Sequence, residues 1–201
     1  MSREIIAILR GVKPDEVVEI CEGILEAGID RIEVPLNSPQ PFDSIAKIAD
    51  AYGKDALIGA GTVLTTENVV KVKEAGGALI VSPDCYVPVI EQTKALGMQS
   101  WPGVITPTEC FTALRAGADG LKIFPGDLLG MAGIKAVRAV LPPETAVFAV
   151  GGAGPENFAD WAAAGATGFG IGSGIYSAGM SAADVRARAD AIVAAYDRVL
   201  G

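Results

Sequence analysis

Short apolar runs alternate with amphipathic segments along this chain of 201 residues. Uninterrupted apolar runs bounded by turn residues are typical of strands that are buried on both faces. We therefore predict strands at residues 5–9, 31–36, 57–63, 78–82, 99–104, 120–124, 146–151 and 168–172. Between them, apolar residues recur at helical spacing. This spacing predicts helices at residues 14–27, 42–51, 67–74, 87–96, 107–116, 131–140, 155–164 and 184–199.

Turn and cap residues mark the ends of these segments. Thr106, Pro107 and Glu109 form a helix-start signal, in which a capping residue precedes a proline and an acid in the first turn. Glycine follows several helices, as at Gly28 and Gly117. Eight successive strand–helix units predict an α/β fold, a compact parallel (β/α)₈ TIM barrel, with residues 1–201 as a single domain. An open doubly wound sheet is the alternative, but the first turn lacks a dinucleotide-binding glycine fingerprint, which favours the barrel.

Composition and charge exclude several classes of partner. Half of the residues are hydrophobic, the net charge is −8 and the pI is near 4.6, which argues against binding nucleic acid. No apolar segment approaches the length of a membrane span. The three cysteines fit no metal or redox spacing, and no signal peptide is recognisable, so we expect a cytoplasmic protein.

The chain contains no histidine. A histidine general base, a Ser-His or Cys-His couple and a histidine metal ligand are therefore excluded. Acid–base chemistry must come from carboxylates, lysine, tyrosine or bound water, and we expect no metal cofactor.

Lys122 lies within the apolar run 120–124. Desolvating an ammonium group is costly unless it is paired or neutral. A lysine that is shifted toward its neutral form is a nucleophile, and its natural reaction is imine formation with a carbonyl substrate. The alternative is a lysine at a strand end that points to solvent.

Other polar side chains fall at or near the carboxyl ends of predicted strands, where the active sites of such barrels lie. They are Arg10, Glu33 and Thr62, from the first three strands. Arg10 would disfavour the charged form of Lys122 and could hold a substrate carboxylate, while Glu33 would transfer protons. A structural cluster of buried ions is the alternative interpretation.

Glycines follow the last two predicted strands, as Gly151-Gly152 and as Gly172 before Ser173. Phosphate commonly binds at this place in the barrel, because glycine lets backbone N–H groups approach the anion. Glycines that serve only tight turns are the alternative. Pro102 is a further candidate at the substrate site, and shaping of the fifth strand alone is its alternative role.

Five motifs in order resemble the family of 2-keto-3-deoxy-6-phosphosugar-acid aldolases. They are Ile-Leu-Arg-Gly at 8–11, Glu-Val-Pro-Leu-Asn-Ser-Pro at 33–39, Gly-Ala-Gly-Thr-Val-Leu at 59–64, Leu-Lys-Ile-Phe-Pro at 121–125 and Phe-Ala-Val-Gly-Gly at 148–152. The resemblance implies that Lys122 forms the Schiff base and that Glu33 is the acid–base residue. It also implies that Thr62 and Arg10 bind the pyruvyl carboxylate. Phosphate would bind at Gly151, Gly152, Gly172 and Ser173.

The family includes gluconate-type and galactonate-type members, and Val150 and Asn37 resemble the galactonate type. The resemblance thus implies metal-free cleavage of 2-dehydro-3-deoxy-6-phosphogalactonate to pyruvate and glyceraldehyde 3-phosphate by a homotrimer, with Val150 contacting the substrate. The alternatives are a gluconate-type or dual-epimer aldolase, a phosphosugar isomerase or epimerase, and a non-catalytic phosphosugar-binding protein. Residues 126–130 depart from both patterns, so their role stays open.

Overall fold

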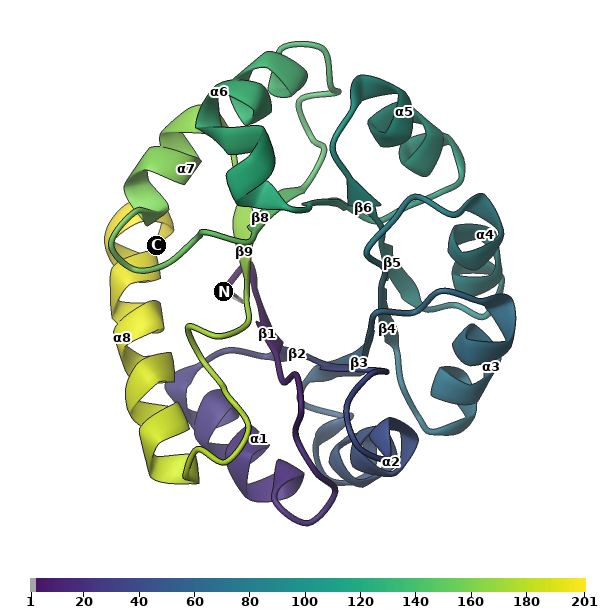
Figure 1. Cartoon of the computed structure of the whole chain (residues 1–201), viewed down its shortest axis with the longest axis vertical. Coiled ribbons are helices and arrows are strands. Elements are labelled where there is room, and N and C mark those ends of the chain that lie inside the picture. Colours follow the sequence, from purple (N-terminus) through teal and green to yellow (C-terminus); the bar gives the residue numbers. More distant parts are fainter. Residues whose placement is uncertain (1–2) are drawn as a thin grey trace.

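The computed structural model describes residues 3–201 and forms a ring of parallel strands enclosed by helices (Figure 1). The strands are β1 (Ile5–Ile8), β2 (Arg31–Pro35), β3 (Leu57–Gly61), β4 (Leu79–Val81), β5 (Gln99–Trp101), β6 (Gly103–Val104), β7 (Leu121–Ile123), β8 (Val147–Val150) and β9 (Gly168–Ile171). The helices are α1 (Val17–Ala27), α2 (Pro41–Tyr52), α3 (Thr66–Glu74), α4 (Val87–Ala95), α5 (Pro107–Arg115), α6 (Gly126–Arg138), α7 (Phe158–Ala164) and α8 (Ala182–Leu200). Residues 1 and 2 of the predicted domain lie outside the described residues, and the single-domain assignment stays a prediction.

The strand order confirms the predicted barrel and corrects one strand. The order is β5-β4-β3-β2-β1-β9-β8-β7-β6, and β5 and β6 are two halves of the predicted strand 99–104. They are separated by Pro102, which has no N–H to donate to a ladder. Before it, β5 pairs with β4, and after it, β6 pairs with β7. The barrel closes at this proline. Its nine strand segments correspond to the eight predicted strands, because β5 and β6 together form the fifth.

Several helix boundaries differ from the prediction. Helix α6 begins at Gly126, five residues before the predicted start, because a first helical turn is joined to the rest across a kink at Gly130 (φ 69°). Helices α1 and α7 begin three residues later than predicted, after turns. No helix within residues 3–201 is long and apolar enough to cross a membrane.

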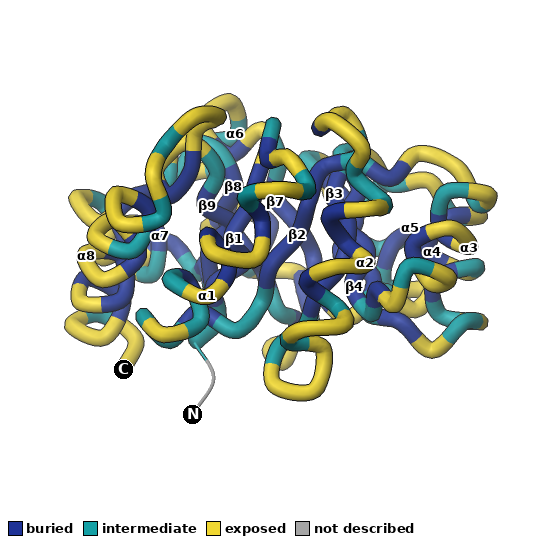
Figure 2. Tube along the Cα trace, turned by 90° about the horizontal axis from the view of Figure 1, so that it is seen from below, coloured by how far each residue is buried: buried dark blue, intermediate teal, exposed yellow. Residues whose placement is uncertain are grey.

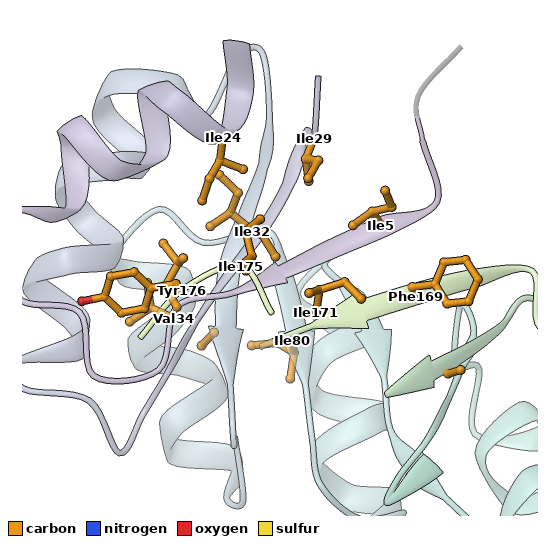
Figure 3. Close-up of a cluster of buried hydrophobic side chains, with 14 of the residues drawn as sticks. Ile5, Ile24, Ile29, Ile32, Val34, Ile80, Phe169, Ile171, Ile175 and Tyr176 are labelled. Carbon is orange, nitrogen blue, oxygen red and sulfur yellow. The ribbon is translucent and has the colours of Figure 1, made fainter. Parts of the chain in front are cut away.

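Apolar side chains from the strands fill two separate regions, because successive side chains of a strand point to opposite faces. Outward-facing residues such as Ile5, Ile32 and Phe169 pack against the helices (Figure 3). Inward-facing residues fill the barrel, where the rings of Trp101 and Phe148 lie 4.3 Å apart. Figure 2 shows the buried strands within an exposed outer layer. This packing holds the strand ends, and any side chain on them, in fixed positions.

Candidate active site

Lys122 and Glu33 both lie in the barrel interior. Lys122 is on β7, where it pairs with Phe148 of β8, and Glu33 is on β2, where it pairs with Ile8 of β1. Only 6% of Lys122 and 1% of Glu33 is exposed. The two side chains line one cavity, together with apolar residues that include Trp101. The structure therefore brings the two predicted central residues together and excludes the solvent-facing alternative for Lys122.

Burial opposes the charged form of each side chain. It raises the pKa of Glu33 from 4.5 to about 7, although the charges of Lys122 and Arg10 act in the opposite direction. Burial also lowers the pKa of Lys122, with Glu33 opposing this shift and Arg10 adding to it. Glu33 Oε2 is buried and has no hydrogen-bond partner among residues 3–201. The shift of Lys122 favours a neutral, nucleophilic amine, and the shift of Glu33 gives a carboxyl group that gains and loses protons near neutral pH.

An aromatic ring adjoins the lysine. The Nζ atom of Lys122 lies 4.5 Å from the centroid of the Phe124 ring. This distance is within the range of a cation–π contact, which favours the charged amine. It therefore opposes the effect of burial on Lys122.

Arg10 lies at the mouth of the barrel and is held by a neighbouring loop. Its Nη1 donates to Asn37 Oδ1 over 2.6 Å, and the next N–H, that of Gly11, donates to Ser38 Oγ over 2.9 Å. These bonds join the loops that follow β1 and β2. Arg10 also lines a second pocket together with Lys122. A guanidinium fixed beside the amine is placed to receive a carboxylate.

The glycines of the last two strands line the same pocket. Gly151, Gly152, Gly172 and Ser173 surround it together with Val150. Gly151 and Gly152 have φ values of 97° and 75°, a conformation that favours glycine. These two positions therefore require glycine for the conformation of the turn. They also line the pocket, so their backbone is accessible to a ligand.

Two residues that the sequence predicts at the site do not line the pocket that contains Arg10 and the paired glycines. Thr62 is half-buried just after β3 and has a φ of 56°. Pro102 is buried between β5 and β6, and its carbonyl oxygen accepts from the Lys122 N–H over 3.0 Å. Pro102 therefore acts on the geometry of the lysine backbone. Neither residue lines the two pockets that contain Lys122.

Three contacts at the site have no signal in the sequence. Asn37 resembles the galactonate type by its position, but the sequence does not indicate its bond to Arg10. Asp127, in the first turn of α6, lies beside the glycine pair: a Cβ on Gly152 would lie 3.1 Å from Asp127 Cβ. Arg188 of α8 donates to the Ser173 carbonyl oxygen over 2.9 Å. Each contact joins segments far apart in the sequence, and no local pattern indicates it.

Within residues 3–201, no group of three or more His, Cys, Asp or Glu side chains is arranged to hold a metal ion. The groups that converge at the site are an amine, a carboxyl group, a guanidinium and the glycines Gly151, Gly152 and Gly172. Together they suit a substrate that contains a ketone, a carboxylate and a phosphate.

Comparison with known proteins gives a consistent result. A family model for "KDPG and KHG aldolase" matches residues 1–191. The chain is 51% identical over 201 residues to the "Probable 2-dehydro-3-deoxy-6-phosphogalactonate aldolase" of Rhizobium meliloti (strain 1021), covering 100% of this chain and 95% of the relative. It is 51% identical over 192 residues to the "2-dehydro-3-deoxy-6-phosphogalactonate aldolase" of Escherichia coli (strain K12), covering 96% and 94%.

A solved structure supports the same grouping. The structure described as "Native KDPGal structure" superposes with a TM-score of 0.97 at 49% identity, covering 100% of this chain and 97% of the other. The similarity thus extends over the barrel and both pockets.

Proposed function

Because this chain belongs to the KDPG and KHG aldolase family, and is thus a carbon–carbon lyase, we propose that it cleaves 2-dehydro-3-deoxy-6-phosphogalactonate to pyruvate and glyceraldehyde 3-phosphate. The observation that carries this proposal is the buried Lys122, with its lowered pKa, across the barrel from Glu33. The 51% identity to two proteins with galactonate names favours this substrate over its gluconate epimer.

Lys122 forms the covalent intermediate. Its neutral Nζ attacks the C2 ketone, and the resulting C2 hydroxyl group leaves as water with the proton of the Glu33 carboxyl group, which gives an iminium ion and an ionised Glu33. Glu33, directly or through water, removes the proton of the C4 hydroxyl group. The C3–C4 bond then breaks, its electron pair moves into the iminium to give an enamine, and glyceraldehyde 3-phosphate leaves. Glu33 returns a proton to C3, and water hydrolyses the imine to release pyruvate and the free amine.

The remaining residues bind the two ends of the substrate. Arg10 and Thr62 hold the carboxylate next to the ketone. Gly151, Gly152, Gly172 and Ser173 receive the phosphate through backbone N–H groups and a hydroxyl. The pocket that Arg10, Lys122 and these glycines share supports this assignment. Val150 lies between the two ends, against the middle of the substrate.

Borohydride trapping tests the imine. Pyruvate plus borohydride should add one reduced pyruvyl group, and peptide mapping should place it on Lys122. Lys122→Met should remove the label, whereas Lys135→Met should keep it, since Lys135 lies on α6 and lines neither pocket. Labelling of another lysine would contradict the proposed mechanism. An isomerase, an epimerase or a non-catalytic binding protein would not be labelled in this way.

The oligomeric state, the metal requirement and the cellular location of the enzyme are part of the same proposal. We expect a homotrimer that needs no metal ion and works in the cytoplasm. The exposed apolar side chains of Leu64 and Tyr86, after β3 and β4, support self-association, and the three cysteines are free. Light scattering should give about three times the 20.6 kDa of one chain.

A further inference from the structure

The carboxyl group of Glu33 lies against the backbone of Gly61, at the end of β3. A Cβ added to Gly61 would lie 1.7 Å from Glu33 Oε2, 2.2 Å from Cδ and 2.3 Å from Oε1. Real contacts between such atoms are about 3.5 Å. The carboxyl group thus fills the space that a side chain at position 61 would occupy.

The strand register explains this contact. Glu33 pairs with Gly59 and Pro35 pairs with Gly61, so Gly61 is the diagonal neighbour of Glu33 on the interior face. A glutamate side chain that leans toward the carboxyl end of β2 therefore reaches Gly61. This direction carries it toward the mouth of the barrel, where the substrate enters.

Backbone conformation does not require a glycine at this position. Gly61 is absent from the positive-φ glycines, which include Gly151 and Gly152 at the same barrel mouth, and it ends a regular strand. In the part of the chain that the structure describes, no hydrogen-bond partner holds Glu33 Oε2 instead. What distinguishes glycine here is the space that it leaves for the carboxyl group.

We propose that Gly61 is a positioning residue, whose missing side chain forms the seat of the Glu33 carboxyl group. The inference rests on the proposed role of Glu33 as the acid–base residue. With alanine at position 61, the carboxyl group must move by more than 1 Å to restore normal contacts. A misplacement of this size can lower a rate by about 10²-fold.

The variant Gly61→Ala tests this role. We expect kcat/KM for cleavage to fall about 10²-fold, mainly through kcat, since the carboxylate and phosphate contacts remain. Borohydride with pyruvate should still label Lys122. The pH–rate profile should also change, because the displaced carboxyl group has a different pKa. A merely destabilised barrel would lose folded protein without a change in the profile.

Two backgrounds separate positioning from general damage. In Glu33→Gln, the acid–base group is already lost, so adding Gly61→Ala should lower kcat/KM by less than about threefold. In Glu33→Asp, the shorter side chain no longer reaches position 61, so Gly61→Ala should again have little effect on activity and on the melting temperature. The Asp background keeps the test possible if Gly61→Ala alone does not fold.

Gly77→Ala provides a matched steric control. Its Cβ would lie 2.5 Å from Val72 Cγ1, just before β4, at the opposite end of the barrel from the site. We expect a lower melting temperature with unchanged kcat/KM and pH profile for the folded enzyme.

The outcomes distinguish this inference from the proposed function. If Glu33→Gln cleaves at the wild-type rate, the acid–base role fails, whatever Gly61 does. If Glu33→Gln loses cleavage but Gly61→Ala keeps the wild-type rate and profile, the positioning role is overturned. It is also overturned if Gly61→Ala lowers the rate equally in all three backgrounds.

Discussion

Glu33 and Lys122 show what burial does to single charged residues. Both side chains lie inside the barrel, where the ionised form of each is poorly solvated. The pKa of Glu33 is raised and that of Lys122 is lowered, so the neutral forms are favoured. This shift suits the proposed chemistry, and it also makes the stability of the fold depend on pH.

Glu33→Gln should stabilise the protein at alkaline pH. Between pH 4.5 and about 7, the folded state holds a proton on Glu33 that the unfolded state releases, so stability falls as pH rises through this window. Glutamine mimics the protonated form. The variant should therefore gain up to roughly 3 kcal/mol over wild type near pH 8 and little below pH 4.5. Thermal unfolding of both proteins across this range measures the gain, and a gain independent of pH would contradict the burial argument.

Thr62 stores backbone strain beside the site. A β-branched residue with a φ of 56° is unfavourable by about 1–3 kcal/mol, whereas asparagine tolerates this conformation. Thr62→Asn should raise the melting temperature by about 2–4 °C and raise KM, because the hydroxyl for the substrate carboxylate is lost. Gln40→Asn is the control: its φ is 44° on the surface before α2, so it should raise stability alone. A lower melting temperature for Thr62→Asn would show that the strain is absent.

Val150 should influence the choice between epimers. Its side chain is 7% exposed and lines both pockets of the site. Threonine has the same shape but adds a hydroxyl that can bond a substrate hydroxyl. Val150→Thr should shift the ratio of kcat/KM for the two epimers toward gluconate by roughly tenfold. Assays of both epimers with both proteins decide this, and a wild-type preference for gluconate would overturn the proposed substrate.

Sequence alone could predict that Lys122 is buried in the barrel, but not the residues that hold its neighbours in place. Lys122 stands out because an apolar run surrounds it, which is a local signal. The contact between Glu33 and Gly61 depends on the register of two strands, and the bond from Arg10 to Asn37 depends on the path of two loops. No local sequence pattern predicts the register of two strands or the path of a loop.

Elements follow the sequence pattern except where a single residue breaks it. The strand–helix alternation was predictable because each unit has its own apolar periodicity and turn signals. The break of strand 99–104 at Pro102 and the early start of α6 were not. The break at Pro102 depends on the pairing of β5 with β4 and of β6 with β7. The early start of α6 depends on a first helical turn that ends at the kink at Gly130.

Helix α5 shows how a local signal stabilises an element whose residues line neither pocket that contains Lys122. Thr106 Oγ1 accepts from the Glu109 N–H over 3.3 Å, and Glu109 Oε2 accepts from the Thr106 N–H over 2.8 Å. Thr106→Ala should destabilise the protein by about 1 kcal/mol, without a change in kcat. Thr108→Ala, an exposed change in the same turn, should be neutral. Denaturant titration measures both, and equal effects would contradict the capping role.

At the scale of the molecule, charge is distributed unevenly. The chain carries a net charge of −8, yet the charged side chains of residues 3–201 that line the pocket with the paired glycines are Arg10 and Lys122, while Asp127 lies beside the glycine pair. A substrate with a carboxylate and a phosphate thus meets locally favourable charge on an acidic protein. The barrel as a whole was predictable, because eight local units leave few ways to bury all strands.

Cleavage should not depend on a metal ion. The iminium on Lys122 would accept the electron pair that a metal would otherwise stabilise, and the chain has no histidine to ligate one. Exhaustive chelator treatment should leave kcat/KM unchanged. Loss of activity that a divalent cation restores would show that this expectation is wrong.

The break at Pro102 also bears on aggregation. Unpaired strand edges are templates on which other chains can add strands. Here the ring is closed, because β5 pairs with β4, β6 pairs with β7, and the two segments are joined through a proline. The carbonyl oxygens of Ser100 and Pro102 also accept from the N–H groups of Asp119 and Lys122. If the barrel opens briefly at this joint, the strands next to the opening are only two or three residues long, and so they are poor templates for another strand.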